Sequence, residues 1–253
     1  MVLASIPIDE QIFAIDIGAT NIKFCHVDVE GELLEAVRRS STPYPCFPTR
    51  LVEILSLRIN KSDVSYVGVG FPGELANGLV TDPGNLARPG GVMTDIDPQL
   101  DDAWRGFALE EALRVSTGRD VRVVNDATLA ALGCCQGTGT ELVLALGTGL
   151  GLALEVEGKL QKVRDVGAEI FVNDKTYDEV LGEQGRSQDE VRWRSLLGKA
   201  VAGFAQEFHA TTVHLAGGNA RRLAPNSLPE VTVSLIVHGN EAPLHGVAKL
   251  FYI

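Results

Sequence analysis

Residues 16–23 read Asp-Ile-Gly-Ala-Thr-Asn-Ile-Lys, and residues 146–151 read Leu-Gly-Thr-Gly-Leu-Gly. Each of these glycine-rich stretches follows a short apolar run and leads into a second one. Apolar runs of this length around a glycine-rich turn are typical of β-hairpins. The runs cover residues 12–15 and 22–27 in the first case and residues 142–145 and 152–156 in the second. A similar hairpin in each half of the chain predicts a duplicated fold.

Both predicted hairpin tips have the chemistry of an anion site. Glycine permits positive φ and lets backbone N–H groups approach an anion without an intervening Cβ, and Thr20 and Thr148 add hydroxyl donors. Taken alone, either loop fits an ordinary tight turn better than a binding site. The pair, in this order and with the segments described below, favours two facing loops that grip a polyphosphate tail.

The segments after each hairpin repeat one order of elements. In the first half, periodicity predicts a strand at 32–40, a helix at 49–60 and a strand at 66–71. In the second half, it predicts a helix at 188–209 and a strand at 212–215, after which residues 217–219 (Gly-Gly-Asn) open a short helix. This repetition predicts an α/β protein with the actin-like ATPase fold, a duplicated ribonuclease H-like arrangement of two domains with a cleft between them.

The predicted N-terminal domain covers residues 1–117 and 240–253, with a C-terminal helix that returns to it, and the predicted C-terminal domain covers residues 118–239. The 253 residues, 45% of them hydrophobic, suffice for one large core or two small ones. The net charge of −11 disfavours nucleic acid and anionic membranes as partners. Residues 1–10 lack a basic segment followed by a long apolar run, so we expect a cytoplasmic protein.

The four cysteines show no metal-binding spacing. None of them forms a C-x-x-C pair, and no histidine pattern lies nearby. We therefore expect no zinc site, and we interpret the adjacent Cys134 and Cys135 as packing residues at the end of a helix. Metal ligation or a disulfide is the minority alternative.

Asp126 stands where a strand meets a helix. The sequence predicts a helix at 104–115, a strand at 121–124 and a second helix at 127–136. An aspartate at a helix start is commonly an N-cap, and that fact alone favours a capping role. The carboxyl end of a strand in an α/β domain is also where ligands bind, so a catalytic role remains open.

Six motifs taken together resemble the ROK family of sugar kinases and repressors, and they follow the family's order over nearly the whole chain. They are Asp16-x-Gly18-x-Thr20, Gly70-Phe71-Pro72-Gly73, Asn85-Leu86, Val124-Asn125-Asp126-Ala127, the second glycine-rich loop, and Ala216-Gly217-Gly218-Asn219. Within the family, the chain is most similar to the polyphosphate glucokinase branch, because of Lys23, residues 176–182 and Trp193.

The resemblance implies a glucokinase-like activity, in which a phosphoryl group moves from ATP or polyphosphate to a hexose hydroxyl with Mg²⁺ as cofactor. Asp126 would be the catalytic base, Asn85 and Asn125 would bind sugar hydroxyls, and Asp16 would lie near Mg²⁺, through water. The expected phosphate and nucleotide contacts come from Gly18, Thr20, Asn21, Lys23, Gly147, Thr148, Gly149, Gly217 and Gly218. Family members are often dimers, so a homodimer is among the expected partners.

The sugar site departs from the family pattern. Family kinases carry Glu-x-Gly-His after the second hairpin, whereas this chain has Asp165, Val166, Gly167 and Ala168. Losing a hydrogen-bonding partner from a buried site costs about 1–3 kcal/mol. A different or modified sugar, substitution by the neighbouring Glu169, or loss of catalysis would each account for the change. Asp178 and Glu179 are candidates for a further sugar-contacting acid, although a solvated helix face explains them equally well.

Two alternatives to the sugar kinase stay open. The missing histidine favours a catalytically degenerate family member that binds sugar or nucleotide as a sensor or partner subunit, while Asp126 and the two loops disfavour it. A kinase for another small metabolite, similar to the type III pantothenate kinases, shares the first loop. It is disfavoured by the motifs at 70–73 and 124–126, which resemble the sugar kinases.

Overall fold

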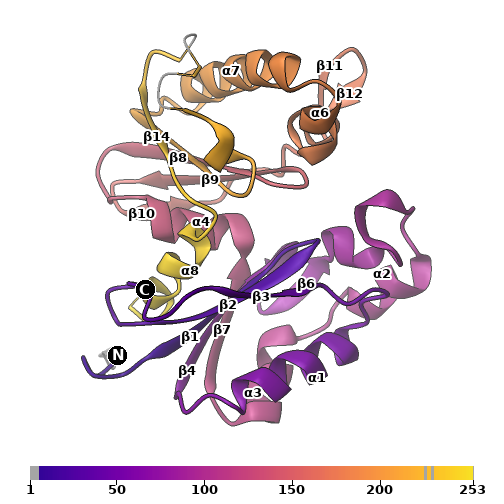
Figure 1. Ribbon diagram of the computed structural model, residues 1–253, viewed down its shortest axis with the longest axis vertical. Helices are drawn as coiled ribbons and strands as arrows, with labels where there is room; N and C mark the ends of the chain where they lie inside the picture. The colour runs from indigo at the N-terminus through magenta and orange to yellow at the C-terminus, as the bar shows by residue number, and fades with distance from the viewer. Residues whose placement is uncertain (1–5, 225–226, 229–230, 253) are drawn as a thin grey trace. The chain divides into compact units, whose positions relative to one another are not determined.

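The computed structural model describes residues 6–224, 227–228 and 231–252, and it divides into two compact units (Figure 1). Unit 1 consists of Met1–Leu129 and Pro243–Ile253, and unit 2 of Ala130–Ala242. None of the described helices combines the length and the apolar character needed to cross a bilayer.

Unit 1 is built on a five-stranded mixed sheet with the order β3-β2-β1-β4-β7. Strand β1 pairs antiparallel with β2 and parallel with β4, and β4 pairs parallel with β7. The strands are β1 (Ile12–Ile17), β2 (Asn21–Val27), β3 (Arg38–Ser41), β4 (Tyr66–Phe71) and β7 (Asp120–Asn125). The carboxyl ends of β1, β4 and β7 therefore meet at one edge of the sheet.

Alternating side chains of β1 give this sheet two covered faces. Phe13, Ile15 and Ile17 join a core that includes Leu51 and Leu55 of α1 (Pro48–Ile59) and Leu113 of α3 (Leu109–Thr117). On the other face, the C-terminal segment packs against β4: the Tyr66 ring meets Phe251 of η4 (Ala248–Phe251) edge-on at 5.4 Å. The remaining elements of unit 1 are β5 (Glu74–Ala76), β6 (Leu79–Asp82), η1 (Gly84–Ala87), η2 (Gly91–Met93) and α2 (Pro98–Trp104).

Unit 2 repeats this topology with the order β10-β9-β8-β13-β14. Strand β8 pairs antiparallel with β9 and parallel with β13, as β1 pairs with β2 and β4. The strands are β8 (Thr140–Leu146), β9 (Leu150–Val156), β10 (Lys159–Gln161), β13 (Thr212–Ala216) and β14 (Ser234–Val237). The two matching sheets confirm the predicted duplicated α/β fold.

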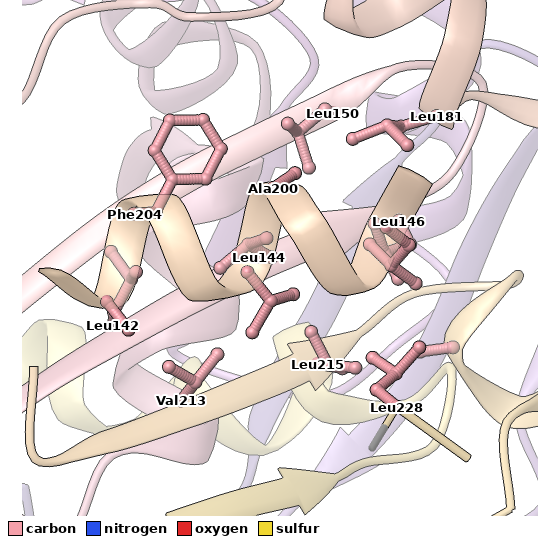
Figure 2. Close-up of a cluster of buried hydrophobic side chains, with 14 of the residues drawn as sticks. Leu142, Leu144, Leu146, Leu150, Leu181, Ala200, Phe204, Val213, Leu215 and Leu228 are labelled. Carbon is pink, nitrogen blue, oxygen red and sulfur yellow. The ribbon is translucent and has the colours of Figure 1, made fainter. Parts of the chain in front are cut away.

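A leucine-rich core fills the space between this sheet and the long helix α7 (Glu190–Glu207). Figure 2 shows Leu142, Leu144 and Leu146 of β8 beneath Ala200 and Phe204 of α7. Trp193 is 1% exposed and donates its indole N–H to the Leu181 carbonyl, so it is the packing residue that its helical position predicts. The other elements are β11 (Ile170–Val172), β12 (Lys175–Thr176), α5 (Tyr177–Leu181), α6 (Glu183–Gln188) and η3 (Ala220–Arg222), and two helices span the unit boundaries, α4 (Asp126–Cys134) and α8 (Ala242–Gly246).

Two predicted elements of unit 1 were wrong in extent. The strand expected at 32–40 is reduced to β3, because β2 pairs with residues 38–41, while Leu33 forms an isolated bridge to Val27. The helix expected at 104–115 is two helices, α2 and α3. The chain leaves α2 after Trp104 and passes through Gly106 at φ 77° before α3 begins.

The boundary between the units also differs from the expected one. Strand β7 was assigned to the C-terminal domain, but it pairs with β4 in the sheet of unit 1. Unit 1 consequently extends to Leu129, within α4, and the return of the chain begins at Pro243. Parallel pairing with a neighbouring strand, which local periodicity does not reveal, decides this boundary.

Candidate functional site

Asp16 ends β1 as a buried acid beside a lysine. Its Oδ2 lies 2.6 Å from Lys23 Nζ, and the two residues are direct partners in the β1–β2 pairing. Its Oδ1 lies on the side of β4, 3.4 Å from where a Cβ on Gly70 would stand. The same point is 3.6 Å from the Cα of Asp126. The structure thus brings Asp16, Lys23 and Asp126 together at the carboxyl edge of the sheet.

The N-cap of α4 is Asn125, not Asp126. Asn125 Oδ1 accepts the N–H groups of Ala127 at 2.9 Å and Thr128 at 3.1 Å, which is the pattern of a helix N-cap. Asp126 Oδ1 accepts only the N–H of the next residue, Ala127, at 2.8 Å. Because the neighbouring amide satisfies the helix, the capping interpretation of Asp126 loses its support.

The Asp126 carboxyl has an unusual affinity for protons. Removal from water and the nearby charge of Asp16 raise its pKa to about 7, against the opposing effects of the Ala127 N–H and of Lys23. A carboxylate that holds its proton this tightly at neutral pH has the strength of a general base.

A glycine connects Asn125 with the segment that precedes Asn85. The Asn125 amide donates to the Gly73 carbonyl at 3.0 Å, and a Cβ on Gly73 would stand 2.2 Å from the Asp82 carbonyl. Asp82 leads directly into η1, where Asn85 is half-buried. In unit 1, Asn125 is therefore linked through Gly73 to the segment that leads to Asn85.

The first hairpin tip is held by hydroxyl groups from a neighbouring segment. Thr42 donates from Oγ1 to the Gly18 carbonyl at 2.6 Å, and the Tyr44 hydroxyl donates to the Ala19 carbonyl at 2.7 Å. Burial raises the pKa of Tyr44 to about 12, so this hydroxyl keeps its proton. The contacts hold carbonyl oxygens and leave the loop to present Thr20 and Asn21, both exposed.

Positive φ is not the reason for the glycines at the two tips. Among the described residues with positive φ, none is Gly18, Ala19, Gly147 or Gly149, so that sequence-based expectation was wrong. In the second tip the reason is close approach: a Cβ on Gly149 would stand 2.3 Å from Asp178 Oδ1. That oxygen accepts the Leu150 N–H at 2.7 Å. Asp178 thus buttresses the tip from α5.

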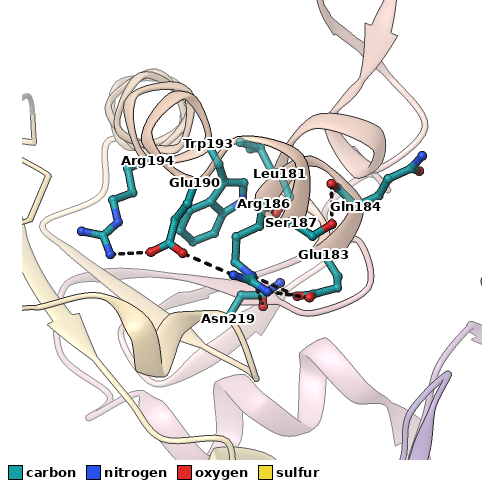
Figure 3. A network of polar contacts seen from close by, with 9 residues as sticks. All are labelled: Leu181, Glu183, Gln184, Arg186, Ser187, Glu190, Trp193, Arg194 and Asn219. Carbon is teal, nitrogen blue, oxygen red and sulfur yellow. Dashed lines mark hydrogen bonds and ion pairs between the residues drawn. The ribbon is translucent and has the colours of Figure 1, made fainter.

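Asn219 holds the second tip from the opposite side. Its amide donates to the Gly147 carbonyl at 2.8 Å, and its backbone N–H donates to the Leu146 carbonyl at 3.0 Å. Gly217 approaches the same strand at φ 95°, with no room for a Cβ. Figure 3 shows Arg186 binding Asn219 and Glu183, with Glu190 beside it. Position 217 requires glycine because a Cβ there would collide with the Leu146 carbonyl, whereas Gly218 has open space around it.

The other predicted sugar-binding acids are already engaged. Glu179 accepts the Thr176 N–H in a capping box of α5, and Glu169 forms an ion pair with Arg164 at 2.7 Å. Asp165 Oδ1 accepts the Gly167 N–H at 2.9 Å. All three acids therefore stabilise the local structure. Ala168, at the position of the family's histidine, is exposed.

Sequence reasoning missed the residues that support the two tips. Thr42 and Tyr44 lie outside every recognised motif, and Asp178 was considered only as a sugar ligand. Asn219 was part of a quoted motif without an assigned role. An asparagine directly after Gly217-Gly218 was the one available signal, because amides are common partners of loop carbonyls.

Comparisons with known proteins agree with this architecture. The model of the ROK family matches residues 12–169. A glucokinase from Halalkalibacterium halodurans is 28% identical over 135 residues, which cover 49% of this chain and 36% of the relative, so the match spans little more than a third of that protein.

Two solved structures extend the similarity to nearly the full chain. The inorganic polyphosphate/ATP-glucomannokinase from Arthrobacter sp. strain KM is 26% identical with a TM-score of 0.79, over 96% of this chain and 99% of that one. A ROK family glucokinase from Streptomyces griseus, in complex with glucose and AMPPNP, shares the fold at 18% identity and a TM-score of 0.73, over 95% and 98%. With its family model matched over more than half of its length, the chain belongs to the ROK family.

Proposed function

We propose that this protein is a sugar kinase that transfers a phosphoryl group from ATP or inorganic polyphosphate to a hexose hydroxyl. The observation that carries the proposal is Asp126, a carboxylate at the carboxyl end of β7 that is freed from capping by Asn125 and whose pKa is raised to about 7. The similarity to polyphosphate- and ATP-using sugar kinases supports it.

Asp126 accepts the proton of the sugar hydroxyl as that oxygen attacks the terminal phosphoryl group. The bond from this phosphorus to the bridging oxygen of the donor breaks, which releases ADP or a polyphosphate shortened by one unit. Phosphoryl transfer depends mainly on positioning and on charge stabilisation, so the base orients the hydroxyl and takes the proton late. Asn85 and the second N–H of the Asn125 amide, whose other N–H is held by Gly73, orient the sugar. A hydroxyl aligned in this way meets the phosphorus in line.

The residues beside Asp126 fit a magnesium ion. Asp16 Oδ2 is bound to Lys23, which leaves Oδ1 as a hard oxygen on the Asp126 side. Mg²⁺ prefers such oxygens and keeps several waters, so Asp16 would hold it through water. When bound, the ion supplies charge that stabilises the transferring phosphoryl group. Lys23 contributes a fixed positive charge to the same neighbourhood.

Each glycine-rich tip, taken by itself, offers hydrogen-bond donors for phosphate groups. In unit 1 these are the side chains of Thr20 and Asn21, because the Gly18 N–H is bonded to the Asn21 carbonyl. In unit 2 they are Thr148 and the Gly149 N–H, because the Gly147 N–H is bonded to the Gly149 carbonyl. The contacts of Thr42 and Tyr44 on one tip and of Asp178 and Asn219 on the other fix the loops before the ligand arrives. Such preorganisation lowers the entropy lost on binding.

The sugar site differs from that of a typical family kinase at one side. Ala168 cannot donate or accept through its side chain, and the carboxylates of Glu169 and Glu179 are bound to neighbours. We infer that the pocket recognises a hexose with a hydroxyl fewer, or with an acyl group, where family members place histidine. Asp165 is exposed and one methylene shorter than the family's glutamate. Its Oδ1 accepts the Gly167 N–H, and we propose that its other oxygen, Oδ2, contacts the sugar.

The test is phosphoryl transfer by the purified chain with Mg²⁺ and either ATP or polyphosphate. The panel of acceptors contains hexoses, deoxyhexoses, amino sugars and N-acetylated sugars. We expect turnover with at least one acceptor, and its loss in Asp126→Asn. Absence of turnover across the panel, with a sugar or nucleotide still raising the Tm, would overturn the kinase in favour of a binding protein.

A further inference from the structure

A second polar cluster lies in unit 2, apart from the residues of the candidate kinase site. It contains Cys135, directly after α4, Glu141 near the start of β8, and His214 in β13. These side chains are 5%, 2% and 0% exposed. They occupy the face of the sheet opposite the leucine-rich core, since Leu142 and Val213, their neighbours in the strands, point into that core. Buried polar groups of this kind need a specific partner.

Glu141 is held in place as a charged group. Its Oε1 accepts the N–H groups of Gly137 at 2.7 Å and Thr138 at 3.0 Å, and Gln136 donates to both oxygens. These backbone donors fix the position of the carboxylate group. The remaining oxygen, Oε2, points to His214 Nε2 at 2.8 Å.

His214 is oriented from its other nitrogen. Its Nδ1 lies 2.8 Å from Nε2 of His238, which follows β14. In this arrangement the Nε2–H of His214 donates to the Glu141 carboxylate. Metal binding at Nε2 requires the ring proton on Nδ1, from which it can be donated to His238. Metal-binding histidines in proteins are oriented in the same way, by a hydrogen bond from the ring nitrogen that does not bind the metal.

We propose that Cys135 Sγ, Glu141 Oε2 and His214 Nε2 form a binding site for a single Zn²⁺ ion, with His238 and the backbone of residues 136–138 as the outer layer. The three ligand atoms lie within 4.8 Å of one another. Ligands at the usual zinc distances of about 2.0–2.3 Å stand about 3–4 Å apart, so closure requires movements of about 1 Å. The fourth tetrahedral position is taken by water.

Charge and ligand type both favour this ion. A thiolate and a carboxylate balance the two charges of Zn²⁺, so the loaded site is neutral, which suits full burial. Binding releases the thiol proton of Cys135, while the ring proton of His214 moves from Nε2 to Nδ1. One sulfur, one nitrogen and one oxygen suit Zn²⁺, whereas Mg²⁺ and Ca²⁺ prefer oxygen ligands alone. The cysteine spacing did not reveal the site, because its ligands come from three separated segments.

The test uses Co²⁺ as a spectroscopic substitute for Zn²⁺ on the full chain after treatment with a chelator. We expect one equivalent of Co²⁺ to produce a thiolate-to-metal charge-transfer band with tetrahedral visible bands, and one equivalent of Zn²⁺ to abolish both. Zn²⁺ raises the Tm at the same stoichiometry, because it binds the folded state. A Co²⁺ ion bound at Asp16 or Asp126 would give no thiolate band, which separates this site from the kinase site.

Cys135→Ser removes the thiolate band, and Cys134→Ser is the matched control, since Cys134 is an equally buried neighbour outside the cluster. His238→Ala retains the band but weakens the affinity about 10–100-fold, as the loss of an orienting partner does elsewhere. Wild-type protein without a thiolate band at one equivalent, or a band that survives in Cys135→Ser, would overturn the proposal. The wild-type titration decides the matter even if a variant fails to fold.

Discussion

The two sheets have the same strand order, yet they support their hairpin tips in different ways. In unit 1, neutral hydroxyls of Thr42 and Tyr44 bind the loop carbonyls, and the charged residues Asp16 and Lys23 lie in the strands beside it. In unit 2, the tip is supported by a carboxylate, Asp178, and by the amide of Asn219. Duplication thus preserved the backbone plan while the side chains that hold each loop diverged.

This difference separates two aspartates with raised pKa values. Burial raises the pKa of both Asp126 and Asp178, but Asp178 Oδ1 is occupied by the Leu150 N–H whereas Asp126 accepts only the N–H of the adjacent residue. Chemistry is therefore expected at the sheet edge of unit 1, and support for the loop in unit 2.

The largest expected effect distinguishes Asp126 from Asp178. Asp126→Asn should lower kcat by about 10²–10⁴-fold, the usual contribution of a general base, while Asp178→Asn keeps an oxygen acceptor for Leu150 and should cost about tenfold or less. Steady-state kinetics of both variants measures this. Equal losses in the two variants would show that the proposed division of roles is wrong.

The pH dependence sharpens the assignment of Asp126. With a pKa of about 7, its carboxylate is the active form, so kcat/KM should fall about tenfold per pH unit below pH 7 and level off above it. Its folded-state pKa lies above the ordinary value of 3.8, so its ionisation costs stability progressively as the pH rises from about 4 to 7.

Asp126→Asn should consequently raise the Tm, by more at pH 8 than at pH 5. Thermal unfolding of the variant and of wild type at the two pH values measures the difference. A Tm gain that is the same at both pH values would contradict the raised pKa.

Substitution of two glycines in the second tip tests whether Asp178 supports this loop. Gly149→Ala places a methyl group 2.3 Å from Asp178 Oδ1 and should destabilise unit 2 by about 1–3 kcal/mol. Gly147→Ala is the matched control, because a Cβ there meets no atom within 4 Å, and its effect should stay within about 0.5 kcal/mol. Urea unfolding measures the stability of both variants. Similar losses of stability would mean that the Asp178 side chain moves aside at little cost.

The smallest expected effect concerns the first tip. Tyr44→Phe removes the hydroxyl that holds the Ala19 carbonyl and should cost about 1 kcal/mol. Tyr66→Phe serves as the control, since the Tyr66 ring packs on Phe251 and its hydroxyl has no hydrogen-bond partner among the described residues. Urea unfolding should show no loss for the control. An unchanged Tyr44→Phe would indicate that Thr42 alone supports the loop.

Most of the fold was predictable because its signals are local. The apolar runs around each glycine-rich turn and the strands at 66–71 and 212–215 follow from periodicity within a few residues. The full extent of the third strand and the helix at 104–115 were not predictable. Residues 38–41 alone form the ladder with β2, and the chain leaves its helix after Trp104, although both sequence patterns look continuous.

The candidate site was predictable only in outline. Its motifs named Asp16, Asn125 and Asp126, but not which of the last two caps α4. Both are good N-cap residues, and the choice depends on where Gly73 and the helix N–H groups stand in space. The roles of the acids at 165–179 were hard to predict for the same reason, because several groups near each acid could have been its hydrogen-bonding or ion-pair partner.

The sequence alone therefore determined the duplicated hairpin-and-helix plan and the family, because both are written in short stretches of neighbouring residues. Only the tertiary structure decided the boundary after Leu129, the assignment of capping to Asn125 and the position of Asp178 beneath a loop. It also brought Cys135, Glu141 and His214 to one buried point. Contacts between distant segments depend on strand pairing and packing, and these arise only when the whole chain has folded.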